Sequence, residues 1–132
     1  SQDSRGLWNV YKIQLLKAET ISKGIRSFLE KTYLYDSLFS VTRIQKRFWD
    51  QLARPINHNA SILLRTQDLP PIYEENSCMY LFTREILMRK RHRIGDRPMM
   101  FEIPAIEAQD IDDETEFNIT EMLMKLRQQG KL

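Results

Sequence analysis

The order of strand-like and helix-like segments in this chain predicts an α/β fold, in which helices are layered on a mixed sheet. Two observations support that class. Residues 37–42 and 76–82 are rich in residues that favour strands, and the second segment is apolar on both faces, as a strand covered from both sides is. Residues 17–31 instead have the apolar spacing of a helix. The length of 132 residues suits a single domain.

The first elements each rest on a local signal. Aromatic and aliphatic residues at 8–16 predict a strand. The helix predicted at 17–31 contains Gly24, which weakens it by about 1 kcal/mol relative to alanine. The apolar spacing of this helix predicts one buried face, made of Ile21, Ile25, Phe28 and Leu29.

Turn and cap residues mark out the second half of the chain. Pro70-Pro71 excludes a regular helix at that point. Thr83 is placed to cap a helix, and Gly130 is placed to end one. After the strand at 37–42, the predicted elements are an extended piece at 44–50, a strand at 76–82, a helix at 83–89, a turn at 94–98, a strand at 99–103 and a helix at 114–129.

One long segment, about residues 43–69, does not fit inside a compact layer of sheet and helices. Segments of this length without secondary structure of their own are usually functional or pack against another chain. We therefore expect an extended arm here.

Bulk properties exclude several classes of protein. The net charge of +2 argues neither for nor against an acidic partner. The one cysteine, Cys78, excludes an internal disulfide and fits a reducing compartment. No apolar run reaches membrane-spanning length and no signal peptide is present, so we expect a cytoplasmic protein with no membrane partner.

The basic run Arg89–Arg93 raises the possibility of nucleic-acid binding, but no nucleic-acid motif accompanies it. A helix end at which cations are favoured by the helix dipole explains the run better, as does contact with an anionic substrate. His58 and His92 have no ligand spacing with Cys78, so a zinc site is not expected.

The acidic run at 107–114 is the most informative stretch of the chain. On an extended strand end, Asp110 and Asp112 would point to the same side. Two converging carboxylates need a cation or protons between them, and Mg²⁺ prefers oxygen ligands. The alternative is an acidic helix start, because Asp113-x-x-Glu116 fits a capping box. On spacing alone, the helix start is the commoner explanation.

Four segments together resemble the acylneuraminate cytidylyltransferases, the enzymes that make CMP-sialic acid. Each segment alone is a weak signal, but all four occur in the family's order, and the turn Arg93-Ile94-Gly95 also fits one of the family's turns. The segments are Asp36–Thr42, similar to the family's central strand; Arg65–Pro71, similar to its Arg-x-Gln-Asp-Leu-Pro segment; Glu75–Tyr80, similar to its Glu-Asn-Gly-x-x-Tyr strand; and Glu107–Asp112, similar to its Glu-Ala-x-Asp-Ile-Asp metal motif.

The resemblance implies a nucleotidyltransferase-type, Rossmann-like sheet and a reaction. The hydroxyl of an acidic nine-carbon sugar attacks the α-phosphate of CTP and releases pyrophosphate, a step that depends on positioning and charge neutralisation. By the same resemblance, Asp110 and Asp112 hold Mg²⁺ as the cofactor, and CTP or CMP and an acidic sugar are the ligands.

The resemblance also implies a homodimer in which the arm reaches into the active site of the partner subunit. Arg65 would then face the sugar carboxylate, which suits the fork of an arginine. Gln67, in the same segment, is a further substrate-binding residue. Asn76 and Tyr80 would line the sugar pocket.

The sequence departs from the family in its nucleotide-binding elements. Its four glycines form no glycine-rich loop of the kind that holds a triphosphate, and the base-recognition segment is absent. Ser77 stands where the family has glycine. We therefore expect the C-terminal half of a cytidylyltransferase-like domain, truncated, inactive alone and dimeric because half a sheet leaves an edge exposed. The alternative is a non-enzymatic module that dimerises and binds an acidic sugar.

Overall fold

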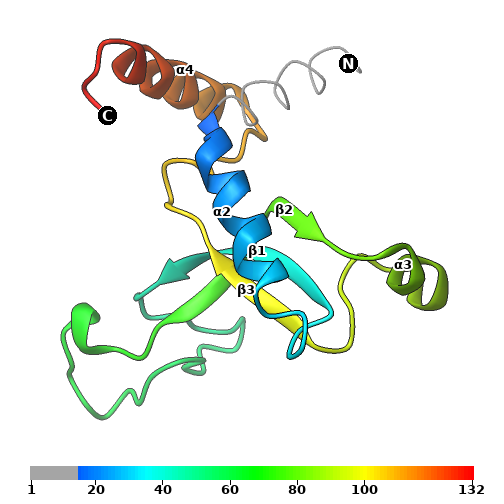
Figure 1. Ribbon diagram of the computed structural model, residues 1–132. Coiled ribbons are helices and arrows are strands. Elements are labelled where there is room, and N and C mark those ends of the chain that lie inside the picture. Colours follow the sequence, from blue (N-terminus) through cyan, green and yellow to red (C-terminus); the bar gives the residue numbers. More distant parts are fainter. Residues whose placement is uncertain (1–14) are drawn as a thin grey trace.

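The computed structural model describes residues 15–132, which form a small α/β domain (Figure 1). Within these residues three strands build one mixed sheet, with the order β2-β1-β3 and one parallel pair. The elements are α2 (Ala18–Leu29), β1 (Ser37–Ile44), the 3-10 turn η1 (Thr66–Asp68), β2 (Ile72–Leu81), α3 (Arg84–Lys90), β3 (Pro98–Glu102) and α4 (Glu114–Gln128). The predicted α/β class is confirmed.

The sheet is organised around β1, which is its central strand. β2 runs antiparallel to β1, with Ile44 opposite Ile72, and β3 runs parallel to it, with Leu38 beside Met99. The core cluster consists of Leu38, Met79 and Ile103, each at most 7% exposed. The strands predicted at 37–42, 76–82 and 99–103 are therefore confirmed, and β2 begins earlier than predicted.

β2 is covered less completely than its sequence predicts. Met79 is buried in the core, whereas Tyr80 is only partly buried and Phe82 is 40% exposed. The prediction of a strand buried on both faces is therefore wrong for the face that contains Tyr80. α2 is the helix that packs against the core cluster, through the partly buried Phe28.

α2 confirms the predicted helix, but of the four residues predicted for its buried face only Phe28 packs against the core. Ile21 is 37% exposed, Ile25 39% and Leu29 62%, whereas Thr20 and Gly24 are the buried positions. Gly24 explains this orientation, because a Cβ there would lie 2.7 Å from Met79 Cε and 3.1 Å from Phe101 Cε2. The glycine that weakens the isolated helix is the residue that lets it approach the sheet.

A large bulge separates the two halves of the β1–β2 pairing. Phe39 lies opposite Tyr80, but Val41 lies opposite Glu75, so Ser40 alone faces the residues between them. Ser40 Oγ donates to Asn76 Oδ1 at 2.5 Å and accepts from the main-chain N–H groups of Cys78 (3.2 Å) and Met79 (2.8 Å). Ser77, within the bulge, has a left-handed backbone with φ of 58°.

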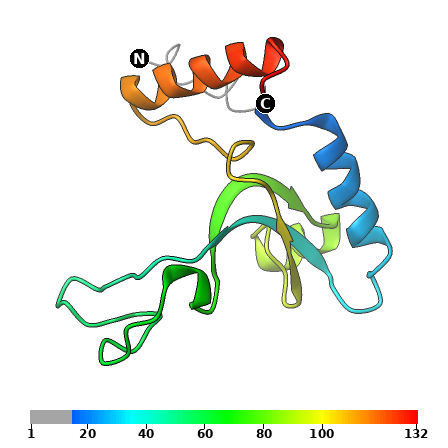
Figure 2. The same ribbon diagram turned by 90° about the vertical axis from the view of Figure 1, so that its left-hand side faces the viewer.

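The connection between β1 and β2 projects away from the sheet as an arm, residues 45–71 (Figures 1 and 2). The extended piece predicted at 44–50 is not a strand; it has only an isolated bridge between Trp49 and Pro55. The strand predicted at 8–16 lies outside the described residues, except for Leu15 and Leu16, which are in no strand.

The last helix, α4, begins with the predicted N-cap Asp113, but the bond back to the Glu116 carboxylate comes from Asp112, one residue before the cap, and not from the cap itself. Asp113 Oδ1 accepts from the Glu116 N–H at 2.7 Å, and Glu116 Oε2 accepts from the Asp112 N–H at 2.7 Å. In α3, Thr83 Oγ1 likewise accepts from the Ile86 N–H at 3.2 Å, as predicted. None of the helices in residues 15–132 is long and apolar enough to cross a membrane.

Candidate functional site

The predicted metal ligands, Asp110 and Asp112, are exposed in the loop between β3 and α4. Ile111 between them is buried, at 7% exposed, and its N–H donates to Asp110 Oδ1 at 3.1 Å. β3 ends at Glu102, so the pair does not lie on a strand end as expected. Burial of Ile111 nevertheless fixes the loop that presents both carboxylates to solvent.

Of the four carboxylates in this loop, Glu107 and Asp113 accept hydrogen bonds at helix N-termini, and Asp110 and Asp112 are the two predicted metal ligands. In residues 15–132, no group of three or more His, Cys, Asp or Glu side chains is arranged to hold a metal ion. Two carboxylates suit Mg²⁺ when substrate phosphate oxygens and water complete its octahedron. The metal site expected at Asp110 and Asp112 therefore stays a prediction.

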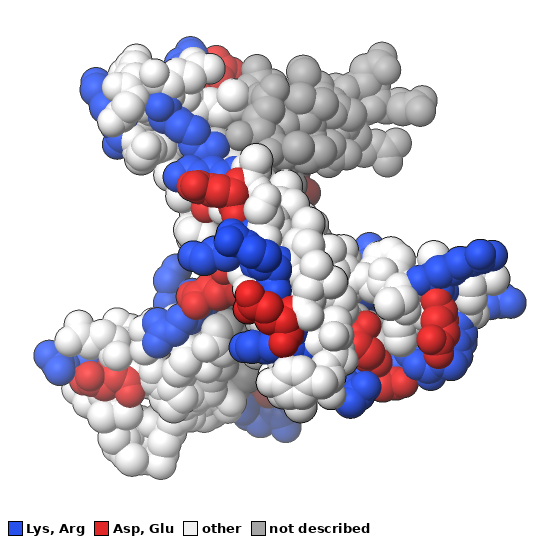
Figure 3. All heavy atoms as spheres, viewed as in Figure 1, with Lys and Arg blue, Asp and Glu red and all other residues white. Residues whose placement is uncertain are grey.

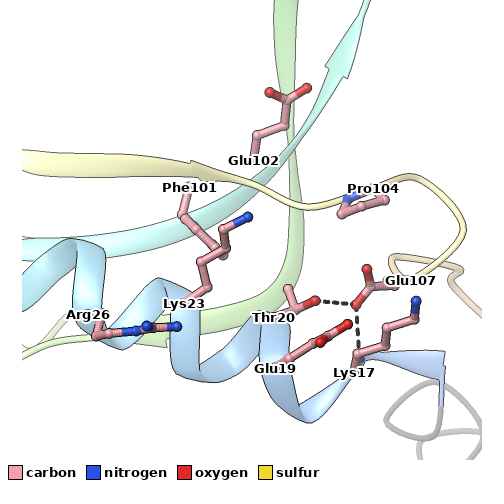
Figure 4. Close-up of a pocket in the computed structure, with 9 residues that line it drawn as sticks. All are labelled: Lys17, Glu19, Thr20, Lys23, Arg26, Phe101, Glu102, Pro104 and Glu107. Atoms are coloured by element: carbon pink, nitrogen blue, oxygen red, sulfur yellow. Dashed lines mark hydrogen bonds between the residues drawn. The ribbon is translucent and has the colours of Figure 1, made fainter.

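Glu107, at the start of the same acidic run, has a structural task. It is only 4% exposed, and its Oε1 accepts from the Lys17 N–H at 2.9 Å and from Thr20 Oγ1 at 2.6 Å (Figure 4). Lys17 is the N-cap residue of α2, so a carboxylate distant in sequence caps this helix. Through Glu107, the acidic run is tied to α2.

Around Glu107 lies an open groove of about 630 Å³, between α2 and the end of β3. Its charges balance, with three basic and three acidic side chains, and Figure 3 shows both signs intermixed on this face of the molecule. A balanced lining gives no strong preference for an anionic ligand. The lining residues are Lys17, Glu19, Thr20, Lys23, Arg26, Phe101, Glu102, Pro104 and Glu107.

The predicted substrate residues of the arm, Arg65 and Gln67, lie beside and within η1. Arg65 Nε pairs with Asp68 Oδ2 at 2.9 Å, and its side chain is 74% exposed. The main-chain oxygen of Gln67 accepts from Gln45 Nε2 at 3.2 Å, which holds η1 against the first residues of the arm. Arg65 is thus presented to solvent at a defined place, with its charge partly offset by a neighbour.

The other two predicted substrate residues are on β2 and have different environments. Asn76 is buried, and its Nδ2 donates to Thr42 Oγ1 at 3.1 Å while its Oδ1 accepts from Ser40. Tyr80 is partly exposed; its hydroxyl hydrogen-bonds to Glu75 and to Ser77 Oγ, the latter at 3.2 Å. Asn76 therefore supports the bulge, while Tyr80 is available at the surface.

One chain does not bring all six residues together. Asn76 and Tyr80 share β2, but Arg65 and Gln67 belong to the arm, and the loop before α4 lies at the other end of the molecule in both views (Figures 1 and 2). Three separate places on one chain therefore contain the predicted residues.

A second cluster, which the sequence did not single out, joins β1 to the turn before β3. Asp36 accepts from the N–H groups of Asp96 and Arg97, each at 3.0 Å, and Ser37 Oγ accepts from the Gly95 N–H at 2.8 Å. A Cβ at Gly95 would lie 2.4 Å from the Asp36 carboxylate, so glycine is required there. Sequence reasoning missed this cluster because Asp36 and the turn at 94–98 are far apart in the chain. The glycine in that turn, Gly95, was the signal that could have pointed to it.

The Asp36 carboxylate is tuned by these contacts. Its partial burial by itself would raise the pKa, but the N–H groups of Arg97 and Asp96 and the Ser37 hydroxyl lower it, and the pKa of Asp36 falls below its usual value. Asp36 is therefore charged at neutral pH and holds the turn through charge-assisted hydrogen bonds.

The chain matches no model of a known protein family, and no curated protein matches it.

Proposed function

We propose that this chain is the sugar-facing, dimerising half of a cytidylyltransferase-like protein, related to the enzymes that make CMP-sialic acid from CTP and an acidic nine-carbon sugar. The observation that carries the proposal is the arm. It projects from the sheet at the place where the family resemblance calls for a dimerisation element, and it contains the Arg-x-Gln-Asp-Leu-Pro segment.

The arm has the surface of an element that packs on another chain. Leu69, at its root, is 3% exposed, whereas Leu63 is 95% exposed and Leu52 65%. Apolar side chains concentrated on one projecting segment are typical of an interface. Other large apolar side chains exposed on the arm are Trp49, Ile56, Ile62 and Leu64.

The backbone of Ser77 is a second support. Its φ of 58° lies in the left-handed region, which glycine occupies without steric cost. Ser77 is the position at which the Glu-Asn-Gly-x-x-Tyr pattern has its glycine. The bulge therefore supplies a physical reason for glycine at that position of the motif, and this agreement favours the resemblance.

Dimerisation would also explain why the predicted residues are separated within one chain. Arg65 on the arm of one subunit would meet Tyr80 of the other, whose strand the buried Asn76 supports. This would place a cation opposite the sugar carboxylate. Asp110 and Asp112 would hold Mg²⁺, which offsets charge on phosphate oxygens when it is bound.

In this proposal, the 132 residues by themselves do not transfer cytidylyl groups. They contain no glycine-rich loop to hold the triphosphate. The test combines light scattering with an assay for pyrophosphate in the presence of CTP, Mg²⁺ and a sialic acid. We expect a dimer without turnover, and turnover when a polypeptide that contains the family's glycine-rich half is added.

Variants of the arm make this test specific. Leu63→Ser should weaken the dimer, because it removes an apolar side chain from the proposed interface. Met88→Ser on α3 is the matched control, since Met88 is also exposed (67%) but lies outside the arm. A monomer at micromolar concentration, or turnover by the 132 residues alone, would contradict the proposal.

The alternative is a non-enzymatic module that dimerises and binds an acidic sugar. The observation in its favour is that Glu107 and Asp113 of the acidic run both cap helices, which gives this run a structural role without a metal. Calorimetry with CMP and with a sialic acid as separate ligands, each with and without Mg²⁺, separates the two. Mg²⁺-dependent binding that is lost in Asp110→Asn supports the enzyme-derived site, and sugar binding without it supports the module.

A further inference from the structure

We propose that Arg93, stacked on Tyr80, binds the planar oxyanion of a polyhydroxylated ligand, so that the exposed surface of β2 is a sugar-acid site within a single subunit. This inference rests on the proposed function for the class of ligand. It adds an anion-binding residue that comes from the same chain as Tyr80, independently of Arg65 on the arm.

Within the basic run Arg89–Arg93, Arg93 is the residue whose guanidinium stacks on an aromatic ring while its N–H groups stay available to a ligand. Its guanidinium carbon lies 4.0 Å from the centre of the Tyr80 ring. Within residues 15–132, no salt bridge or hydrogen bond engages its side chain, whereas Arg89 and Lys90 both pair with Asp96, at 3.0 and 2.6 Å. The stacked face orients the fork, and its N–H edge remains available for a carboxylate or phosphate.

The turn that contains Arg93 is fixed at its far side. Gly95, Asp96 and Arg97 donate their N–H groups to the Asp36–Ser37 pair, as described above. Closer to Arg93, the Ile94 N–H donates to His92 Nδ1 at 3.0 Å. A side chain on an anchored turn loses less conformational entropy when it binds a ligand.

Tyr80 is held in place as well. Its hydroxyl contacts the Glu75 carboxylate and Ser77 Oγ, and all three groups lie on the exposed part of β2. Glu75 and Ser77 thus bring a carboxylate and a hydroxyl to the edge of the ring on which Arg93 stacks. A ligand with one anionic group and several hydroxyls satisfies both parts, whereas inorganic phosphate satisfies only the fork.

Amide NMR titrations of the whole 132-residue chain test this site, with N-acetylneuraminic acid, its methyl ester, CMP and inorganic phosphate as separate probes. We expect shifts in the Tyr80 and Arg93 region with the free acid, a loss of affinity of about tenfold in Arg93→Gln, and a partial loss in Arg93→Lys, which keeps the charge but not the fork. Arg91→Gln is the matched control, because it removes the same charge from an exposed arginine two residues away.

Each outcome decides the inference. Tighter binding of the free acid than of the ester, lost in Arg93→Gln and kept in Arg91→Gln, supports it. Equal affinities for the free acid and for inorganic phosphate would show that the Arg93 guanidinium binds phosphate groups, and would overturn the proposal that the ligand is a sugar acid. Equal losses in both arginine variants, or no shifts at 20 mM probe (an order-of-magnitude ceiling, about the weakest binding of interest), would overturn the site. Failure of the proposed function is recognised separately, by the oligomeric state and by the effect of the arm variant.

Discussion

The sheet and the arm of this chain are stabilised in different ways. In the sheet, Leu38, Val41 and Ile103 are at most 1% exposed, and side-chain hydrogen bonds fill the gaps in the strand pairing. In the arm, the contacts are mostly polar: Gln45 Nε2 donates to the Leu69 oxygen at 2.9 Å, and the Phe48 N–H donates to Asn57 Oδ1 at 2.9 Å. The arm is thus shaped by hydrogen bonds, while the sheet is stabilised by apolar burial.

This difference indicates that the sheet provides most of the stability of a subunit, whereas the arm is available for contacts with another chain. Burial of apolar surface is the dominant favourable term in folding, and exposed hydrogen bonds add little net free energy. The arm should therefore contribute little to the free energy of unfolding of a single subunit, and its exposed apolar residues remain available for another chain. Four paired substitutions test this separation, each with one residue in the sheet or at its edge and one in the arm.

The largest effect is expected from Leu38→Ala, which opens a cavity in the core and should cost about 2–5 kcal/mol of the free energy of unfolding. Leu63→Ala in the arm removes a side chain that is 95% exposed, so its effect on subunit stability should be within about 0.5 kcal/mol. Urea denaturation of both variants, at protein concentrations low enough for the chain to be monomeric, measures the difference. Similar losses in the two would show that the arm folds as part of the core.

Ser40→Ala should cost about 2–3 kcal/mol, because it removes the hydroxyl that accepts from the buried Met79 N–H and that also bonds to Asn76 Oδ1 and the Cys78 N–H. Ser61→Ala, at an exposed position of the arm, is the control and should be near neutral. Thermal unfolding followed by circular dichroism gives both values. A neutral Ser40→Ala would mean that the bulge is not held by this side chain.

The third comparison concerns pH. The lowered pKa of Asp36 means that its charged form stabilises the folded state above the ordinary value of 3.8, and that this contribution is lost as the pH falls below it. The difference in free energy of unfolding between the wild type and Asp36→Asn should therefore be constant from pH 7 to about 5 and then decrease toward zero at lower pH. Asp50, in the arm, also has a lowered pKa, through the main-chain and side-chain donors of Arg54.

Because Asp50 is only partly buried and is paired with Arg54 of the same arm, Asp50→Asn should leave the pH dependence of global unfolding unchanged. Urea titrations at a series of pH values measure both variants. A difference for Asp36→Asn that widens toward low pH would contradict the assignment of the Asp36 contacts.

The smallest effect is expected from glycine at two of the three non-glycine positions in residues 15–132 that have a left-handed backbone. Ser77→Gly should stabilise by about 0.5 kcal/mol, since relief of the left-handed strain outweighs the greater freedom of the unfolded chain. Ala53, with φ of 61°, lies in the arm, and Ala53→Gly should not change global stability. Ser77→Val, a β-branched residue at the same φ, should instead destabilise. Differential scanning calorimetry resolves these shifts, and a destabilised Ser77→Gly would refute the argument from strain.

The sequence predicted the elements whose signals are local. Thr83 and Asp113 were recognised as helix caps, and β1 was recognised from its β-favouring residues, because these depend on neighbours a few positions away. The arm between β1 and β2 was predicted too, since proline and polar residues exclude regular structure there. Its projection from the sheet was the physical consequence of that composition.

The buried face of α2 and the environment of the acidic run could not be predicted in this way. Apolar periodicity predicted burial of Ile21 and Ile25, but the fit of Gly24 against Met79 and Phe101 turned the helix otherwise. Similarly, Glu107 caps a helix that lies far away in the sequence, a pairing that no local pattern encodes.

The amino-acid sequence by itself therefore determined the class of fold, the helix caps and the segments without secondary structure, because neighbouring residues suffice for these. The tertiary structure alone decided which face of α2 is buried, that Ser40 fills the bulge, and that Arg93 lies on Tyr80. Those features depend on contacts between parts of the chain that are far apart in sequence. Because protein interiors are closely packed, the shapes of the side chains at these contacts decide which arrangement is possible.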